Sequence, residues 1–238
     1  METPQEVIKR MLSLKNANPE IVASKNPKDL CLPDGSIDPR SLRSFEDRVK
    51  ASGLEEAQLE KNFEAFEPSP ENKAIFDEMK AWTFTKYGLM LGGDVGRGKT
   101  HLCVALCLKM MEQRYNAYFA PVGKTLNELM TMKSHELPEE RNKYSELMQK
   151  LTTVEILILD DLGTETLTEA KMTALFDIIN QRTNNKEKRK TFFTTNLRWK
   201  LIEEKYDQRI TSRIREICDF RLLDGIDMRE EMRKERMR

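Results

Sequence analysis

A glycine-rich stretch at residues 93–100, GDVGRGKT, has the residue types and spacing with the clearest chemistry in the sequence. It matches G-x-x-x-x-G-K-[ST] at every fixed position, which is the pattern of a phosphate-binding loop. Glycines let the backbone curl so that its N–H groups face a polyphosphate, and the N-terminus of the next helix adds partial positive charge. We expect Lys99 to reach the β- and γ-phosphates of ATP and the Thr100 hydroxyl to bind Mg²⁺.

The surroundings of this loop favour nucleotide binding over a chance glycine-rich turn. An apolar strand is predicted just before the loop and an apolar helix just after it, as phosphate-binding loops require. The expected nucleotide contacts are Gly93, Asp94, Val95, Gly96, Arg97, Gly98, Lys99, Thr100 and His101.

Two carboxylates follow a second apolar run, ILILDD at 156–161, which predicts a buried strand ending in Asp160 and Asp161. Ligands of parallel sheets bind beyond the carboxyl ends of the strands, so both acids are expected beside the loop. We expect Asp160 to hold Mg²⁺ through water, and Asp161 to orient or deprotonate the attacking water. The alternative is a pair of acids that only forms the turn after a strand.

Asn196 ends the next predicted strand, within KTFFTTN at 190–196. An amide at that place can hydrogen-bond the γ-phosphate or the attacking water, although asparagine is also a common turn residue.

Arg209 and Arg213 lie four residues apart on one face of a predicted helix, whose isoleucines would bury a neighbouring face. Guanidinium groups suit the stabilisation of a transferring phosphoryl group, and one can be supplied by a neighbouring molecule. The alternative is an exposed helix whose arginines form salt bridges with Glu203, Glu204 or Glu216.

The elements that must position these residues alternate between strand and helix, which predicts an α/β fold. The expected architecture has three layers, with a five-stranded, mostly parallel sheet covered by helices on both faces. Strands are predicted at 87–91, 117–121, 156–160, 191–195 and 220–223, and helices at 99–115, 123–134, 139–151, 168–184 and 198–217. An earlier helix is expected to begin with Ser69 as its N-cap and Pro70 at its first position.

The N-terminal part differs in composition from the rest. A short amphipathic helix is predicted at 3–16, a Pro- and Asp-rich linker at 25–40 and a second helical segment at about 42–51. We therefore divide the chain into a helical extension at 1–54 and an ATPase domain at 55–238.

Composition excludes several classes of protein. With two histidines, a histidine-based zinc site or hydrolase triad is not expected, and Cys103 and Cys107 are expected to pack in the core. No apolar run approaches membrane-spanning length and no signal peptide is recognised, so we expect a cytoplasmic protein without a membrane partner. The formal net charge is zero, so DNA contacts would need local patches such as 186–190 or 198–200, which otherwise are solvated surface.

Five segments, taken in order, resemble the DnaC/DnaI-type helicase loaders and their IstB-like relatives, and the resemblance covers about residues 50–230. The segments are GGDVGRGKTHL, ILILDDLGTE, TFFTTNL, YDQRITSRI and GIDMR. The resemblance implies an AAA+ ATPase that associates head to tail through its ATP sites. By this resemblance Asn196 is the first sensor, Arg213 the arginine finger, Arg209 an accessory arginine and Arg229 a second-sensor arginine.

The resemblance also implies partners: a replicative helicase of the DnaB family and the single-stranded DNA on which the helicase is placed. An IstB-like regulator of a transposase is the alternative, and a small-molecule kinase is a third reading that the sensor and RIxSRI motifs oppose. The sequence departs from larger loaders in two ways. Its N-terminal segment lacks the set of cysteines and histidines needed for a zinc site, and only 25 residues follow Arg213, too few for a helical lid domain. We therefore expect an open ATP site and weak hydrolysis by the isolated chain.

Overall fold

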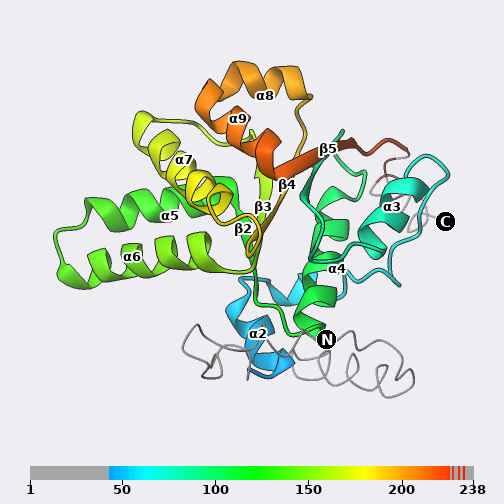
Figure 1. Cartoon of the computed structure of the whole chain (residues 1–238), viewed down its shortest axis with the longest axis horizontal. Helices are drawn as coiled ribbons and strands as arrows, with labels where there is room; N and C mark the ends of the chain where they lie inside the picture. The colour runs from blue at the N-terminus through cyan, green and yellow to red at the C-terminus, as the bar shows by residue number, and fades with distance from the viewer. Residues whose placement is uncertain (1–42, 226, 228–229, 231–232, 234–238) are drawn as a thin grey trace.

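The computed structural model describes residues 43–225, 227, 230 and 233, and they form a parallel sheet covered by helices on both faces (Figure 1). Each pairing between neighbouring strands is parallel, and the strand order is β2-β3-β4-β1-β5. The strands are β1 (Gly88–Gly92), β2 (Ala117–Pro121), β3 (Ile156–Leu162), β4 (Lys190–Thr195) and β5 (Cys218–Leu222).

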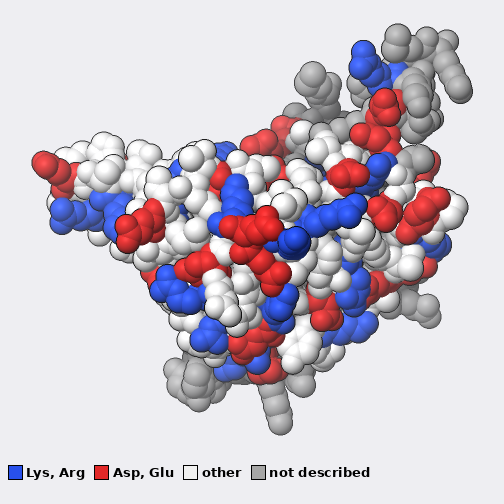
Figure 2. All heavy atoms as spheres, turned by 90° about the horizontal axis from the view of Figure 1, so that it is seen from above, with Lys and Arg blue, Asp and Glu red and all other residues white. Residues whose placement is uncertain are grey.

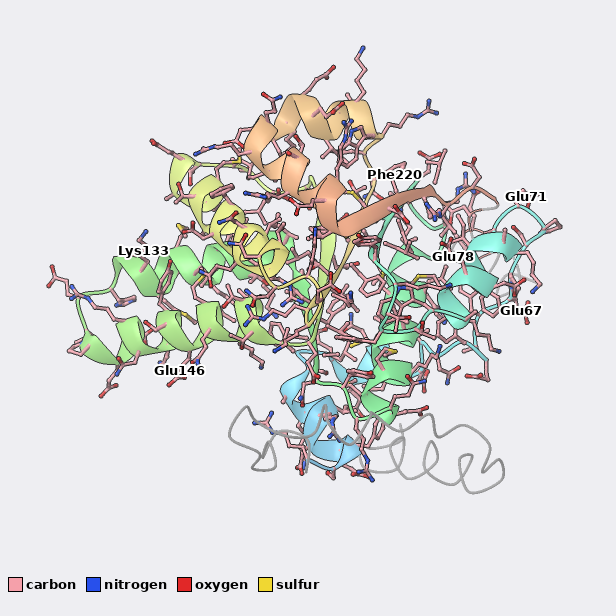
Figure 3. The ribbon with its side chains drawn as sticks, in the orientation of Figure 1. Glu67, Glu71, Glu78, Lys133, Glu146 and Phe220 are labelled. Atoms are coloured by element: carbon pink, nitrogen blue, oxygen red, sulfur yellow. The ribbon has the colours of Figure 1, made fainter. Side chains whose placement is uncertain are left out.

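Two sets of helices flank the sheet. On one side lie α2 (Phe45–Ala51), α3 (Lys73–Lys80) and α4 (Lys99–Glu112), with the short 3-10 helix η3 (Glu56–Gln58) between α2 and α3 in the chain. On the other side lie α5 (Val122–Ser134), α6 (Pro138–Thr153), α7 (Glu169–Thr183), α8 (Trp199–Lys205) and α9 (Gln208–Ile217). The α5–α6 pair projects away from the sheet, as Lys133 and Glu146 show in Figure 3.

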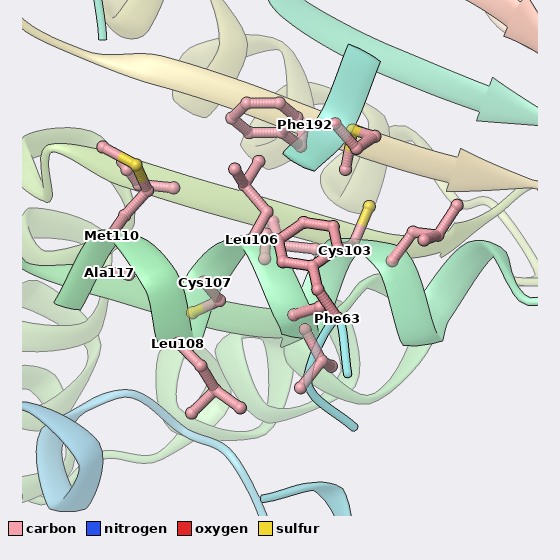
Figure 4. Close-up of a cluster of buried hydrophobic side chains, with 14 of the residues drawn as sticks. Phe63, Cys103, Leu106, Cys107, Leu108, Met110, Ala117 and Phe192 are labelled. Carbon is pink, nitrogen blue, oxygen red and sulfur yellow. The ribbon is translucent and has the colours of Figure 1, made fainter. Parts of the chain in front are cut away.

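Alternation along the strands divides the core into two clusters, because successive side chains of a strand point to opposite faces. Phe192 packs with the α4 side of the sheet, and its neighbour Phe193 packs with the α7 and α9 side. On the α4 side, Cys103 and Cys107 lie fully buried beside Leu106 and Phe192, as Figure 4 shows. The expectation that these cysteines pack in the core is confirmed, and burial raises the pKa of Cys107 to about 12.

The predicted strands agree with the observed ones to within two residues, but two helix predictions were wrong in detail. The predicted helix at 198–217 is two helices, because Tyr206 and Asp207 are extended and Asp207 caps α9 by accepting from the Ile210 N–H at 3.0 Å. The helix expected to start at Ser69 begins at Lys73 instead. The Ser69 carbonyl accepts from the N–H groups of Asn72 and Lys73, so residues 69–72 form a turn ahead of α3.

The division of the chain near residue 55 stays a prediction, and the segments at 3–16 and 25–40 lie outside the described residues. Helix α2, the described part of that extension, packs against α4 through Phe45 and Val49, and the Phe119 N–H donates to the Ser52 carbonyl at 2.7 Å. Within the described part of the chain, no helix combines the length and apolarity needed to cross a membrane.

Candidate nucleotide-binding site

The phosphate-binding loop joins β1 to α4, and its glycines adopt conformations that other residues rarely adopt. Gly93, Gly96 and Gly98 have φ angles of 138°, 82° and 89°. A Cβ on Gly93 would lie 2.3 Å from the carbonyl oxygen of Leu223, and one on Gly98 would lie 2.4 Å from the Phe66 ring. The loop therefore needs glycine both for its curl and for the close approach of its neighbours.

Strand β5 supports the start of this loop. The Leu223 N–H donates to the Gly92 carbonyl at 2.7 Å. The Phe220 ring, labelled in Figure 3, lies so close to Gly92 that an added Cβ would be 2.4 Å from its Cζ atom.

Lys99 is folded back into the loop, with its side chain 7% exposed. Its Nζ donates to the carbonyl oxygens of Gly93 and Asp94, each at 2.7 Å. The ammonium group thus lies inside the curl of the loop. A bound phosphate would take the place of these carbonyl acceptors and accept charge-assisted hydrogen bonds from Lys99.

The acid predicted to serve Mg²⁺ meets the threonine predicted to bind it. Asp160 Oδ1 accepts from the Thr100 hydroxyl at 2.9 Å and from the Thr194 hydroxyl at 2.7 Å. Burial raises the pKa of Asp160, and the two hydroxyl donors act in the opposite direction. Sequence reasoning missed Thr194, whose hydroxyl also accepts from the Asp161 N–H at 2.8 Å. The available signal for Thr194 was its position on the strand next to that of the acid pair, two residues before Asn196.

Asp161 and Asn196, predicted from separate strands, lie side by side. The Asn196 amide Nδ2 donates to Asp161 Oδ1 at 3.1 Å. Asp161 has a φ of 61°, in the left-handed region that non-glycine residues seldom adopt, and strand pairing with β4 is irregular between Leu159 and Leu162. This conformation bends the chain near the end of β3 and separates the Asp161 carboxylate from the buried Asp160.

These residues fit ATP and Mg²⁺ as bound groups. The glycine curl with Lys99 inside it suits a polyphosphate, and the Thr100 and Asp160 oxygens are the hard ligands that Mg²⁺ prefers. When bound, Mg²⁺ would neutralise charge on the transferring phosphoryl group. Among the described residues, no group of three or more His, Cys, Asp or Glu side chains is placed to hold a metal ion by itself.

The segment leading to α3 also contacts the loop. The Asn62 carbonyl lies 2.8 Å from Nε2 of His101, and the Phe66 ring meets the His101 ring edge-on at 5.1 Å. Burial lowers the pKa of His101. His101 was expected to contact nucleotide, and here it ties the start of α4 to residues 62–66, which sequence reasoning did not include in the site.

The predicted arginines lie on α9 and pair with acids of their own helix or its cap. Arg209 donates to Asp207 Oδ2 at 2.7 Å, and Arg213 donates to Glu216 Oε2 at 2.9 Å. Glu216 also accepts from Lys186 at 3.0 Å. The salt bridge between Arg213 and Glu216 is one of those expected under the alternative of an exposed helix whose arginines only form salt bridges. Arg229 lies outside the described residues.

The basic segments considered for DNA binding are engaged within the protein in part, while Lys188, Arg198 and Lys200 are exposed. In the first segment Lys190 is buried, and in the second Trp199 packs edge-on against Phe220 at 6.1 Å, with the Arg215 guanidinium 4.8 Å from its ring centre. Figure 2 shows acidic and basic side chains intermixed on the face seen from above. Trp199 therefore packs a helix start, which was the alternative to stacking on DNA.

Asp227 contributes a carboxylate to the loop that sequence reasoning did not include. A Cβ added to Gly96 would lie 2.0 Å from Asp227 Oδ1, so the carboxylate rests directly against the phosphate-binding backbone. The same oxygen accepts from the Glu230 N–H at 3.3 Å. An anion at this position repels the phosphates of an incoming nucleotide.

We therefore expect Asp227→Asn to bind ATP about fivefold more tightly, since removing one like charge nearby is worth about 1 kcal/mol in water. Asparagine keeps an oxygen to accept from Glu230, so the fold is retained. Titration with a fluorescent ATP analogue measures the affinity, and the exposed Asp224→Asn is the matched control. Equal or weaker binding by Asp227→Asn would contradict the expectation.

Comparison with known proteins places this geometry in context. The family model described as IstB-like ATP binding protein matches residues 22–223. Among curated relatives, the insertion sequence IS21 protein of Pseudomonas aeruginosa, named for ATP binding, is 27% identical over 146 residues, covering 60% of this chain and 52% of its own. The corresponding IS1162 protein of Pseudomonas fluorescens is 28% identical over 116 residues, covering 49% and 46%. The chain thus spans about half the length of these relatives.

Solved structures show the same fold. The DnaC helicase loader superposes with a TM-score of 0.57 at 22% identity, over 71% of this chain and 99% of that one. DnaI gives 0.55 at 23% identity, over 74% and 94%, and DnaA from Aquifex aeolicus bound to AMPPCP gives 0.59 at 19%, over 75% and 55%. The predicted AAA+ P-loop fold is therefore confirmed.

The family model spans well over half of the sequence and includes the loop, the acid pair, the asparagine and the α9 arginines. This chain belongs to the family of IstB-like ATP-binding proteins.

Proposed function

We propose that this protein is an Mg²⁺-dependent ATPase that binds a replicative hexameric helicase and helps to place it on single-stranded DNA. The observation that carries the ATPase part is the cluster at the carboxyl edge of the sheet, where Lys99, Asp160, Asp161 and Asn196 come together around the glycine loop. The loader part is supported by the likeness of fold to DnaC along 99% of that chain, and by the order of motifs in the sequence.

Each residue has a distinct task in this proposal. Lys99 and the loop N–H groups bind the phosphates, and Thr100 with Asp160 holds Mg²⁺. The Asp161 carboxylate takes the proton of the attacking water, and the Asn196 amide fixes the direction in which that carboxylate points. Arg213, from a neighbouring subunit, stabilises charge on the transferring phosphoryl group. Binding of a second subunit would bring this arginine to the ATP site.

The loader proposal is tested by mixing the protein with the replicative helicase of its host, ATP and Mg²⁺, followed by size-exclusion chromatography with light scattering. We expect a stable complex that is lost when residues 1–40 are removed. A further readout is delivery of the helicase onto a fluorescent single strand that carries no free end. Active ATPase without any helicase complex would contradict the loader proposal.

A second candidate is a regulator of a transposase that assembles on DNA, and the IS21 and IS1162 relatives favour it. It shares the ATPase site, so only the partner separates the two. ATP-dependent assembly on duplex DNA, together with capture of a transposase and not of a helicase, would support this candidate.

A further inference from the structure

A buried contact joins the turn after β3 to the junction of α8 and α9. Glu165 is 7% exposed and Tyr206 3% exposed. The Tyr206 hydroxyl donates to Glu165 Oε1, and the Gly163 N–H donates to Oε2 at 2.9 Å. Burial and the neighbouring carboxylate raise the pKa of Tyr206, so its hydroxyl keeps its proton and remains a donor.

Lys205 also holds this turn. Its Nζ donates to the carbonyl oxygens of Gly163 and Glu165, the second at 2.9 Å. Gly163 has a φ of 107°, and an added Cβ would lie 2.5 Å from Leu197. The turn is therefore fixed by hydrogen bonds to α8 and its C-terminal cap, and by close packing against the segment after β4.

This turn begins at Asp161. The Asp161 carbonyl accepts from the Thr164 N–H at 3.4 Å and from its hydroxyl at 3.0 Å. The left-handed conformation of Asp161 is strained for a residue with a Cβ, and persists only where the surroundings hold it. The groups that hold the far end of the turn are Glu165, Tyr206 and Lys205.

We propose that Glu165, Tyr206 and Lys205 are positioning residues for hydrolysis, an inference that rests on the proposed ATPase function. Their contacts hold the turn so that the Asp161 carboxylate faces Asn196 and the attacking water. They also fix this turn relative to α9, because Tyr206 directly precedes its cap, Asp207, which binds Arg209.

The burial of Glu165 supports a role beyond stability. Burying a carboxylate is costly, and apolar residues of similar volume often stabilise a core as well or better. Both carboxylate oxygens of Glu165 instead accept hydrogen bonds that orient one turn and one tyrosine. A shift of this turn by about 1 Å would displace Asp161, and misplacement of that size lowers rates by up to about 100-fold.

The test is the ATPase kinetics of full-length variants, measured under the conditions that give the unaltered protein its highest rate. We expect Tyr206→Phe to lower kcat about tenfold while KM for ATP changes less than about twofold, because the phosphate-binding loop is untouched. Glu165→Ala should show the same split with a larger loss. Tyr118→Phe is the matched control, since Tyr118 is a half-buried tyrosine on β2 with its ring under Lys150.

Glu165→Gln separates position from charge. Its amide can accept from the Gly163 N–H and donate to the Tyr206 oxygen, so positioning predicts that kcat stays within about threefold of the unaltered protein. If Glu165→Gln lowered kcat as much as Glu165→Ala, the inference would be overturned, because hydrolysis would then depend on the negative charge of Glu165 and not on its hydrogen bonds. Unchanged kcat in Tyr206→Phe, or equal changes in KM and kcat, would overturn it as well while leaving the ATPase proposal intact. Absence of ATP hydrolysis by the unaltered protein would overturn both.

Discussion

Asp161→Asn is expected to lower the rate of ATP hydrolysis by about 10³-fold, within the range found when a general base is removed. The amide cannot take a proton from water, and it presents an N–H₂ group as well as an oxygen to Asn196. Binding of ATP should change less than about threefold, because Lys99 and the glycine loop are not altered. Release of phosphate under single-turnover conditions measures the first quantity, and titration with a fluorescent ATP analogue the second.

The structure offers a matched control in Asp77→Asn. Asp77 lies on α3, is more than half exposed and pairs with Lys73. Its substitution therefore removes the same negative charge, but at a place away from the carboxyl end of β3. Asn196→Ala should give a smaller loss than Asp161→Asn, because the carboxylate remains and only its direction is freed. If Asp161→Asn hydrolysed ATP at the normal rate, Asp161 would be a turn-forming residue only and the base would have to be sought elsewhere.

Much of this site could be predicted from sequence because its parts are local or lie at equivalent strand ends. The glycine loop is one continuous segment, and parallel strands bring their carboxyl ends to one edge, so Asp160, Asp161 and Asn196 had to lie near it. The order β2-β3-β4-β1-β5 sets which ends are neighbours, and β4 lies between β1 and β3. That order placed Thr194 against both acids, a contact that the spacing alone did not single out.

Contacts made by side chains from distant segments were not predictable in the same way. Glu165 and Tyr206 are 41 residues apart, and no periodicity connects a loop glutamate to a tyrosine between two helices. The break at Tyr206 was missed because residues 198–217 contain no glycine or proline, while the Asp207 cap was the local signal for it. Likewise, Asn62 reaches His101 only because the lead-in to α3 folds over the loop.

The ion pairs of α9 bear on whether its arginines can act on nucleotide. Arg213 is 39% exposed and Glu216 38%, and exposed pairs of this kind are worth only about 0–1 kcal/mol. Glu216 keeps Lys186 as a partner when Arg213 leaves. The guanidinium can therefore be redirected to a phosphate of a neighbouring subunit at small cost, and the observed salt bridge does not oppose that role.

Arg213→Ala is accordingly expected to lower hydrolysis by the assembled protein about 10³-fold, which is the lower end for loss of an arginine finger. Binding of ATP by the single chain should be unchanged, and so should the melting temperature to within about 2 °C, because only an exposed ion pair is lost. Arg215→Ala on the same helix is the control, since Arg215 is also exposed and paired, with Glu203. Arg209→Ala should show a smaller loss.

Mixing two inactive variants tests whether Arg213 acts across a subunit boundary. Asp161→Asn lacks the base but keeps Arg213, and Arg213→Ala lacks the arginine but keeps Asp161. If the arginine is supplied by a neighbour, a mixed assembly contains boundaries where an intact Asp161 meets an intact Arg213, so mixing should restore about a quarter of the activity at equal amounts for random pairing. If Arg213 served the site of its own chain, no subunit in the mixture would hold both residues, and the mixture would be as inactive as its components. Restored activity would thus identify the ATP site as shared between two copies of this chain, which the single chain cannot complete alone.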